Sequence, residues 1–490
     1  MKCIKREIIF LLLICIVSSV QAQTWEQMNS TKKEAIKHFN EDKFGLFIHW
    51  GIYSLWGGMY KGQKIDDIVS PEPNDACWVQ ARARIPRVEY QQLMKQFDPV
   101  KFNANEYVAL IKEAGMKYVV ITSKHHDGFA LWDSKVSDFD MGSTPSKRNL
   151  VKELYEACQR QGVDFGVYYS HNIDWNDAHD CNIKTYCDVT GEVWPEPADF
   201  KGKKRRPMGA NLWDPSPNTF DEYLVNKAYP QVKELLEMFP NMKFMWYDFA
   251  HFLSKDQSFK FYQLVYKLNP NVIVTDRVGH DLGDFNIPGD NKIPNPEDMG
   301  GKHWETVGTF NNSWGYKEYD KDFKSPYELI YWITAIASRG GNYMLNIGPK
   351  GDGSIPEESV KNLKEIGKWM SVNGKAIYGT KQWKVSREGE DTQKMLGTGH
   401  RATHGFTSNF TTSDFWFTTK GNKVYAIALE RGKEALIKSF AGEEIKEVKL
   451  LGHSKKLKWK QTAEGLSIVL PKNKDSQIGY AIEVTLVSSL

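Results

Sequence analysis

Between residues 43 and 350 the sequence alternates short apolar runs with longer stretches whose apolar residues recur every three or four positions. The short runs predict buried β-strands, and the longer stretches predict amphipathic helices. In the stretch 103–115, Asn103 is suited to cap a helix and Gly115 to end it. The predicted strands cover residues 43–51, 116–126, 163–171, 242–250, 271–277, 303–310 and 341–349.

Strands that alternate with helices indicate parallel βα units, and about seven such units favour a (β/α)8-like barrel over an open sheet. The sequence does not reveal an eighth strand. After residue 380 the pattern changes to alternating strands with turn residues and no helix, which is typical of an antiparallel β-sandwich. We therefore predict a barrel over residues 23–380 and a β-sandwich over residues 381–490.

The first 22 residues have the pattern of a secretory signal peptide. Lys2, Lys5 and Arg6 precede a short apolar run, and small residues stand before Gln23. The run is too short to span a membrane, so we expect a secreted or periplasmic protein without membrane insertion. Export permits disulfides, and the spacing of Cys181 and Cys187 allows a small closed loop without requiring one.

Composition and charge narrow the classes of partner. The chain carries 64 Lys and Arg against 61 Asp and Glu, which gives a net charge of +3 and no strong attraction to nucleic acid. Aromatic residues make up 13% of the chain, and their flat faces can stack on sugar rings as well as fill a core. Residues 172–217 form a long connection without periodicity, which is typical of a functional loop.

Polar and aromatic residues recur near the ends of the predicted strands. In a barrel the C-terminal ends of the strands meet at one rim, and active sites lie at that rim. Adjacent side chains on an extended chain point to opposite faces, so His125 and His126 can share a pocket only where the chain bends. The residues concerned are His49, Trp50, His125, His126, Tyr169, His171, Asp248, Asp276, Arg277, Glu305 and Asn346.

Two of these residues, Asp248 and Glu305, are carboxylates in aromatic surroundings. Two carboxyl groups about 5 to 5.5 Å apart are what retaining glycoside hydrolysis requires. A salt bridge between Asp248 and Arg277 is the structural alternative, and the two interpretations are compatible because an arginine keeps a nucleophile ionised. Zinc bound by His125 and His126 is disfavoured because the sequence lacks suitably spaced further ligands.

The motifs at these positions resemble those of the α-L-fucosidases of glycoside hydrolase family 29. The resemblance covers about residues 40–380 and includes GLFIHWGIYS, KYVVITSKHHDGFALWDS, FMWYDF, WETVGTFNNSWGY and ASRGGNYMLNIGPKGDGSIP. It implies a barrel with a C-terminal β-sandwich, a retaining mechanism and no metal or other cofactor. It also implies that Asp248 is the nucleophile and Glu305 the acid/base. The residues it implies for sugar binding are His49, Trp78, His125, His126, Tyr169, Trp246 and Arg277.

Two departures from the family pattern concern the sugar. Family members often have a Glu-Trp pair where this chain has Cys77 and Trp78, and a thiol is a poor hydrogen-bond partner. Either Asp75 supplies the missing contact or the hydroxyl recognition differs. Phe249 also follows the nucleophile where a small residue is expected.

These departures leave several functions to weigh. The main prediction is an exo-acting α-L-fucosidase whose partner is a fucosylated oligosaccharide or polysaccharide. The alternative is an α-L-galactosidase or a transfucosylating relative that acts on plant or algal glycans. A catalytically inactive carbohydrate-binding protein is a further alternative, against which the two carboxylates argue. Homo-oligomerisation is compatible with the sequence.

Overall fold

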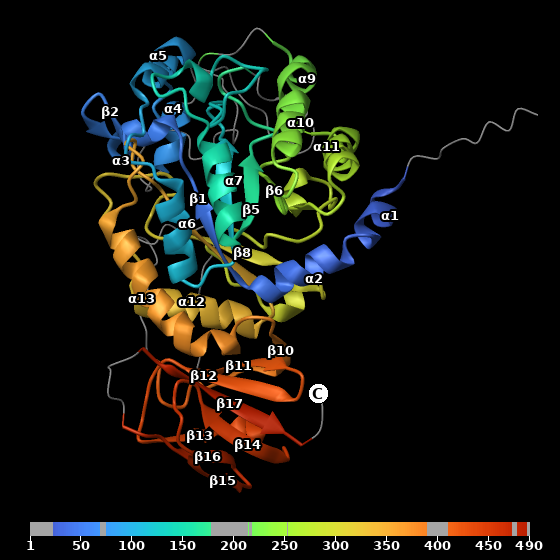
Figure 1. Cartoon of the computed structure of the whole chain (residues 1–490), viewed down its shortest axis with the longest axis vertical. Coiled ribbons are helices and arrows are strands. Elements are labelled where there is room, and N and C mark those ends of the chain that lie inside the picture. Colours follow the sequence, from blue (N-terminus) through green and yellow to red (C-terminus); the bar gives the residue numbers. More distant parts are fainter. Residues whose placement is uncertain are drawn as a thin grey trace, which may run out of the picture.

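The computed structural model describes residues 23–68, 75–177, 214, 218–251, 253–389, 410–472 and 478–487. The predicted signal peptide and the Cys181–Cys187 pair lie outside these ranges. Figure 1 shows two parts, a βα domain at the top and a smaller β-domain below it. Within the described ranges, no helix combines the length and apolar character needed to cross a membrane.

A curled, seven-stranded parallel sheet forms the centre of the first part, and it confirms all seven predicted strands. Isolated bridges join Thr275 to Phe285, Asn286 to Trp304 and Asp290 to Val307, so the segment 285–290 links the two edges of the sheet without forming a regular eighth strand. In sheet order the strands are β7 (Ile273–Val274), β6 (Phe244–Tyr247), β5 (Asp164–Tyr169), β4 (Tyr118–Lys124), β1 (Phe44–Ile48), β9 (Asn342–Ile347) and β8 (Glu305–Thr309).

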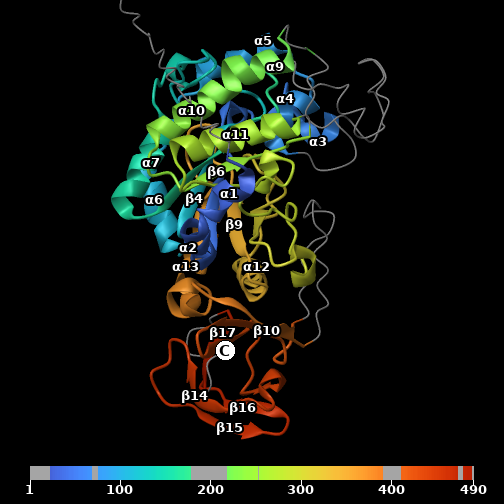
Figure 2. The ribbon, with the colours of Figure 1, turned by 90° about the vertical axis from the view of Figure 1, so that its right-hand side faces the viewer.

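Helices cover the outside of this sheet (Figures 1 and 2). As the sequence predicts, the side chain of Asn103 caps α6 by accepting from the backbone N–H groups of Asn105 and Glu106. The larger helices are α2 (Lys33–Asp42), α6 (Ala104–Glu113), α7 (Leu150–Gln161), α10 (Tyr229–Met238), α11 (Lys255–Leu268), α12 (Pro326–Ser338) and α13 (Glu357–Asn373). The shorter helices are α1 (Trp25–Ser30), α3 (Ile65–Ile68), α4 (Val79–Arg82), α5 (Arg87–Gln91) and α9 (Phe220–Tyr223), and a small hairpin joins β2 (Met59–Tyr60) to β3 (Gln63–Lys64).

The interior of the curled sheet is a compact aromatic and aliphatic cluster. Phe39 of α2 closes its lower end and packs against Tyr118 with ring centroids 5.9 Å apart. Successive strand residues alternate between this interior and the helix-covered outside. The cluster includes Phe47, Tyr118, Val120, Tyr168, Phe244, Trp246, Ile273, Val307 and Met344.

The second part is the predicted β-sandwich, and its first strand begins at Lys381. One sheet contains β10 (Lys381–Glu388), β11 (Phe415–Lys420), β12 (Lys423–Ala428), β17 (Tyr480–Leu486) and β14 (Ile445–Leu450), and the other contains β13 (Glu434–Ile437), β16 (Gly465–Val469) and β15 (Lys458–Thr462). One apolar cluster drawn from both sheets forms its core. Tyr331 of α12 packs edge-on against Trp416 of β11, so the sandwich docks on the barrel through α12.

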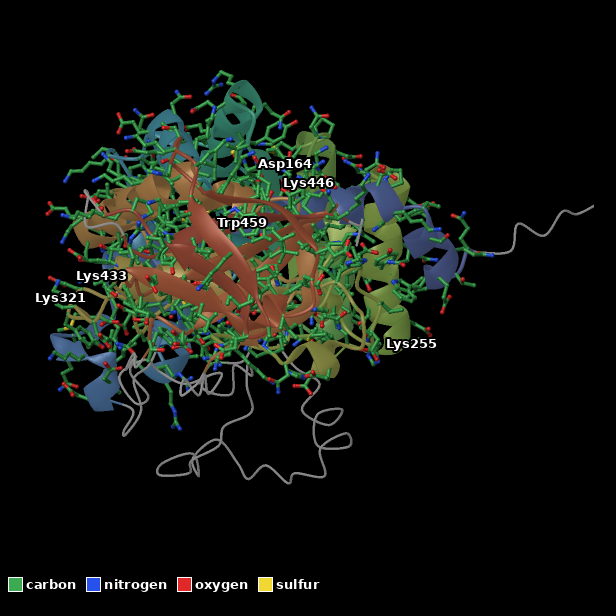
Figure 3. All side chains as sticks on the ribbon, turned by 90° about the horizontal axis from the view of Figure 1, so that it is seen from below. Asp164, Lys255, Lys321, Lys433, Lys446 and Trp459 are labelled. Atoms are coloured by element: carbon green, nitrogen blue, oxygen red, sulfur yellow. The ribbon has the colours of Figure 1, made fainter. Side chains whose placement is uncertain are left out.

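The two parts meet at the N-terminal end of the barrel strands. In Figure 1 the helices that follow β1, α3 to α5, lie at the opposite end from the sandwich. Figure 3, viewed from below, shows the sandwich in front of the barrel, with Trp459 on it. The rim formed by the C-terminal ends of the strands is therefore far from the sandwich.

Candidate active site

Asp248 lies at the C-terminal rim, directly after β6, and is 7% exposed. Its Oδ1 accepts a hydrogen bond from Arg277 Nη1 at 2.8 Å, and its Oδ2 accepts one from the Tyr168 hydroxyl at 3.0 Å. Burial raises the pKa of Asp248 above its usual value, while Arg277 and Tyr168 favour the charged form. The predicted pair of Asp248 and Arg277 therefore exists, and it sits where a barrel enzyme places its chemistry.

A second carboxylate, that of Asp290, pairs with Nη2 of the same arginine. Asp290 lies on the irregular segment that links the sheet edges, and its side chain is 30% exposed, which makes it accessible to solvent. The charge of Asp290 acts on Asp248 and favours a higher pKa there, which shows that the two groups are close. Burial lowers the pKa of Arg277, but the two carboxylates outweigh burial and raise it. The guanidinium thus holds two carboxylates side by side.

His126 presents an unprotonated nitrogen to Asp248. The Ser170 hydroxyl donates to the Ile173 carbonyl at 2.7 Å, so His126 Nδ1 must be the donor in its 2.7 Å contact with Ser170 Oγ. Burial lowers the pKa of His126 well below its usual value, so the ring is neutral and Nε2 carries a lone pair. The Nε2 atom lies 3.7 Å from Asp248 Oδ2. Both atoms are hydrogen-bond acceptors, so a donor such as a sugar hydroxyl can bind beside them.

His49 is oriented in the same manner. Asn346 uses its amide N–H to bind the Trp314 carbonyl, so its Oδ1 faces His49 and receives the Nδ1 proton at 2.6 Å. Burial lowers the pKa of His49 to about 3, which keeps the ring neutral with an accepting Nε2. His49 is therefore a second fixed acceptor for a hydroxyl group.

The bend predicted at His125 and His126 is present. Strand β4 ends at Lys124, and a turn follows, so the two rings lie 4.2 Å apart. The His125 ring is also 5.6 Å from that of His49. Its Nδ1 is buried and has no hydrogen-bond partner in the described part of the chain, which is typical of a group that a ligand satisfies.

Aromatic rings form the apolar part of the site. Trp246 stacks on Tyr168 with ring centroids 5.5 Å apart, and Arg277 lies 5.1 Å above its ring. The ring of Trp314, a residue that was not predicted for the site, lies 5.0 Å from that of His49. The only sequence signal for Trp314 was its presence in the FNNSWGY motif. These rings offer flat surfaces to the apolar face of a sugar.

The segment that contains Cys77 forms the next part of the wall. Trp78 lies edge-on to His126 at 5.0 Å and to Phe249 at 5.9 Å. Cys77 is buried, and burial raises the pKa of its thiol. Asp75 accepts from the backbone N–H of Trp314 at 3.2 Å, so it supports the loop of that tryptophan.

Tyr169 does not belong to the pocket, and this corrects the sequence analysis. Its hydroxyl donates to Gln231 of α10 at 2.8 Å, so the side chain points to the outer helices. Strand alternation places the preceding residue, Tyr168, inside the barrel and in contact with Asp248. The sequence YYSH at the end of β5 gave no indication of which tyrosine faces inward.

Glu305 does not lie near Asp248 either. It begins β8 rather than ending it, and it pairs with Asn342 at the start of β9. Its Oε1 accepts from the hydroxyl of Tyr118, the first residue of β4, at 2.5 Å. Glu305 thus lies at the floor of the barrel, whereas Asp248 lies at the rim. The carboxyl that shares Arg277 with Asp248 is that of Asp290.

His125 and His126 do not belong to a group of side chains with metal-like spacing in the described part of the chain. Within the described ranges, one group of side chains has metal-like spacing, and it consists of His38, Asp42 and Asp164. This group lies on α2 and at the start of β5, at the opposite end of the barrel from Asp248.

Two adjacent carboxylates on one arginine, with fixed hydroxyl acceptors and aromatic faces beside them, meet the needs of glycosidic bond cleavage. We therefore assign the chain to the glycoside hydrolases.

The comparisons with known proteins narrow this class. The family described as alpha-L-fucosidase matches residues 13–375, and the alpha-L-fucosidase C-terminal domain matches residues 408–486. The chain therefore belongs to the α-L-fucosidase family.

The individual proteins that the chain resembles are also described as alpha-L-fucosidases. The chain is 30% identical to human plasma alpha-L-fucosidase over 95% of this chain and 92% of the relative, and 29% identical to the alpha-L-fucosidase of Dictyostelium discoideum over 77% and 78%. Among solved structures, an alpha-L-fucosidase from Vibrio sp. strain EJY3 has a TM-score of 0.73 at 29% identity, covering 93% of this chain and 73% of that one. A trapped covalent intermediate of the Bacteroides thetaiotaomicron enzyme with 2-fluoro-fucosyl fluoride has a TM-score of 0.72 at 25% identity, covering 93% and 96%.

Proposed function

We propose that this protein is a retaining exo-α-L-fucosidase that removes terminal α-L-fucosyl residues from oligosaccharides or polysaccharides. The observation that carries the proposal is the pair of carboxylates, Asp248 and Asp290, held by the two terminal nitrogens of Arg277 at the rim of the barrel. Family membership supports L-fucose as the sugar that is removed, and the pair of carboxylates supports a double-displacement mechanism.

Asp248 acts as the nucleophile. Arg277 and Tyr168 bind its two oxygens and favour the charged form that attacks the anomeric carbon. The bond to the leaving oxygen breaks as the bond to Asp248 forms, which gives a covalent fucosyl ester. Both donors are buried or half-buried, so they stay in place while the charge on Asp248 disappears.

Asp290 acts as the acid and then as the base. In the first step its protonated form gives a proton to the leaving oxygen, and in the second its carboxylate takes a proton from the attacking water. Its 30% exposure allows it to exchange protons with solvent between the two steps. Arg277 keeps it beside the nucleophile, at the position where the leaving group departs.

The pocket suits a 6-deoxy sugar. His49 and His126 present neutral acceptors to ring hydroxyls, while Phe47, Trp246 and Trp314 supply apolar surface. L-Galactose differs from L-fucose by a hydroxyl on C6, and an apolar surface disfavours that group. The comparisons do not favour the α-L-galactosidase alternative.

The decisive experiment follows the hydrolysis of a 4-nitrophenyl α-L-fucoside by proton NMR. The first free sugar should be α-L-fucose, since two inversions restore the starting configuration. The matching α-L-galactoside should be a poorer substrate. Early appearance of β-L-fucose would overturn the retaining mechanism, and absence of any hydrolysis would overturn the function.

The N-terminal sequence further supports the proposal that the protein is secreted or periplasmic. Expression of the full chain in a bacterial host with separate assay of periplasm, medium and cytoplasm tests this. A mature N-terminus at Gln23 in an exported fraction is the expected result, and full-length protein confined to the cytoplasm would contradict it.

Light scattering of the purified protein decides whether it forms a homo-oligomer.

A further inference from the structure

Three side chains of the kinds that bind metal ions meet at the floor of the barrel, at the opposite end from the candidate active site. His38 and Asp42 stand four residues apart on α2, so both project from one face of this helix. Asp164 is the first residue of β5. One nitrogen or oxygen atom from each side chain lies within 4.8 Å of the other two. Figure 3 shows Asp164 on the side of the molecule that is seen from below.

The contacts inside this cluster leave one carboxylate oxygen without a donor. His38 Nε2 lies 2.7 Å from Asp164 Oδ2 and 3.7 Å from Asp42 Oδ2. The first distance is that of a hydrogen bond, whereas the second is too long for one. Asp42 Oδ2 is buried and has no hydrogen-bond partner in the described part of the chain, and the Asp42 side chain is only 12% exposed. A buried acceptor without a donor is typical of a group that a ligand satisfies.

The end of α2 is also a place where a cation is favourable. The unpaired carbonyl groups give the C-terminus of a helix a partial negative charge, which a cation stabilises. The last turn of α2 contains Glu41 and Asp42 and no basic residue. The charge of Lys117 acts on Asp42, but the Lys117 ammonium lies over the ring of Tyr378, 4.5 Å from its centroid. A bound cation would therefore compensate both the helix end and the acidic side chains.

The chemistry and spacing of the cluster fit a transition-metal ion. Zinc and related ions accept an imidazole nitrogen together with carboxylate oxygens. Zinc bonds of about 2.0 to 2.2 Å in tetrahedral geometry separate the ligand atoms by about 3.3 to 3.6 Å. The His38–Asp42 distance of 3.7 Å is close to this range, and the His38–Asp164 contact has to open by roughly 0.6 to 0.9 Å to reach it. The His38 side chain is 56% exposed, so it has room to move and water can fill the fourth position.

We propose that His38, Asp42 and Asp164 bind one divalent transition-metal ion, with zinc as the favoured metal, and that this ion joins α2 to β5. The ion replaces the proton that His38 Nε2 shares with Asp164, so binding releases a proton. Helix α2 carries Phe39, which closes the lower end of the barrel, and β5 is an interior strand of the sheet. The metal thus stabilises the closed barrel and takes no part in the reaction. The inference does not depend on the proposed function.

Isothermal titration calorimetry with zinc chloride tests the site. It uses the full chain, purified without a polyhistidine tag and freed of metal by EDTA and dialysis. Wild type should bind one zinc ion at this cluster, and Asp42→Asn and His38→Ala should each weaken that binding at least about tenfold, because each variant lacks one of the three ligands. Glu41→Gln is the matched control. It removes the same charge from an exposed neighbouring position of α2 and should change the affinity by about twofold or less.

Melting temperatures supply a second readout, because a ligand that binds the folded chain stabilises it. Excess zinc should raise the melting temperature of wild type and of Glu41→Gln by about 2 to 4 °C. It should not raise that of Asp42→Asn. Magnesium should have a smaller effect on wild type, because this ion prefers oxygen ligands in octahedral geometry.

Three results would overturn the proposal. Wild type that binds no zinc would do so, as would zinc binding that is unchanged in both His38→Ala and Asp42→Asn. Equal losses in Asp42→Asn and Glu41→Gln would show a general attraction to acidic groups in place of a site. His38 is more than half exposed, so His38→Ala keeps the test available if Asp42→Asn does not fold.

Activity separates this inference from the proposed function. EDTA should lower the melting temperature of the zinc-loaded enzyme and leave kcat unchanged well below that temperature, because the cluster lies at the opposite end of the barrel from Asp248. A loss of kcat that zinc restores would contradict the purely structural role of the metal. Failure of wild type to cleave any fucoside would refute the proposed function while leaving the calorimetric and melting results intact.

Discussion

The two ends of the barrel contain the same chemical group in different surroundings. At the rim, Arg277 binds the carboxylates of Asp248 and Asp290, and both groups have a cation beside them. At the floor, Glu305 accepts a hydrogen bond from the phenol of Tyr118 and is buried more completely. Arg277 favours the charged form of Asp248, whereas no cation pairs with Glu305 in the described part of the chain and burial raises the pKa of that carboxyl to about 8. The described parts of the two ends therefore differ in whether a cation is paired with the carboxyl group.

The largest effect should come from the nucleophile. Asp248→Asn keeps the shape of the side chain and removes its charge, so turnover of an aryl α-L-fucoside should fall by roughly four to six orders of magnitude, as for other nucleophiles that act as part of a unit. Stopped assays at high enzyme concentration measure the residual rate. Azide should restore turnover of Asp248→Gly and yield a β-L-fucosyl azide. An active Asp248→Asn enzyme would shift the nucleophile to another residue.

Asp290→Asn should produce the next largest effect, and it should depend on the leaving group. General acid catalysis contributes about 10² to 10⁴-fold, so a fucosyl disaccharide should lose activity within that range. A 2,4-dinitrophenyl fucoside needs little protonation and should lose much less in the first step. A plot of log kcat/KM against leaving-group pKa checks this slope for wild type and variant. The same slope for both would show that Asp290 is not the acid.

The fold was largely predictable because its signal is repeated along the chain. Seven apolar runs separated by amphipathic stretches predicted the parallel sheet, and the change of pattern at Lys381 predicted the sandwich. The position of Asp248 at the rim was also predictable, since this residue directly follows an apolar strand. The segment 285–290 was not, because its bridges to β7 and β8 depend on the closed curvature of the sheet and not on a strand-like sequence.

The two errors in the candidate site have the same origin. The motif WETVGTF predicts that Glu305 lies on a strand, but it does not indicate at which end of the strand. In the structure the strand begins at this residue. Similarly, the sequence around Tyr168 and Tyr169 predicts a strand, but it does not indicate which of the two side chains faces the interior of the barrel. Asp290 stands among glycine, proline and asparagine, where an aspartate is typical of a turn. Its role depends on Arg277, which lies 13 residues away.

The two tyrosines form a matched pair of controls. Tyr168→Phe removes one donor from Asp248 and should lower kcat/KM about tenfold, in line with the loss of a hydrogen bond to a charged group. Tyr169→Phe removes the bond to Gln231 on the helix side and should leave kcat/KM unchanged while lowering the free energy of unfolding by about 1 kcal/mol. Equal kinetic effects would contradict the assignment of inward and outward faces.

The smallest predicted effect is a shift in the acidic limb of the pH profile. The nucleophile must be ionised, so kcat/KM should fall as the pH drops through the pKa of Asp248, which burial raises above that of a free aspartate. Tyr168 stabilises the charged form of Asp248, so Tyr168→Phe should move this limb to higher pH. Tyr169→Phe should leave the limb in place. Profiles of kcat/KM from pH 4 to pH 7 measure both, and a limb that moves to lower pH in Tyr168→Phe would show that the phenol does not donate to Asp248 in the working enzyme.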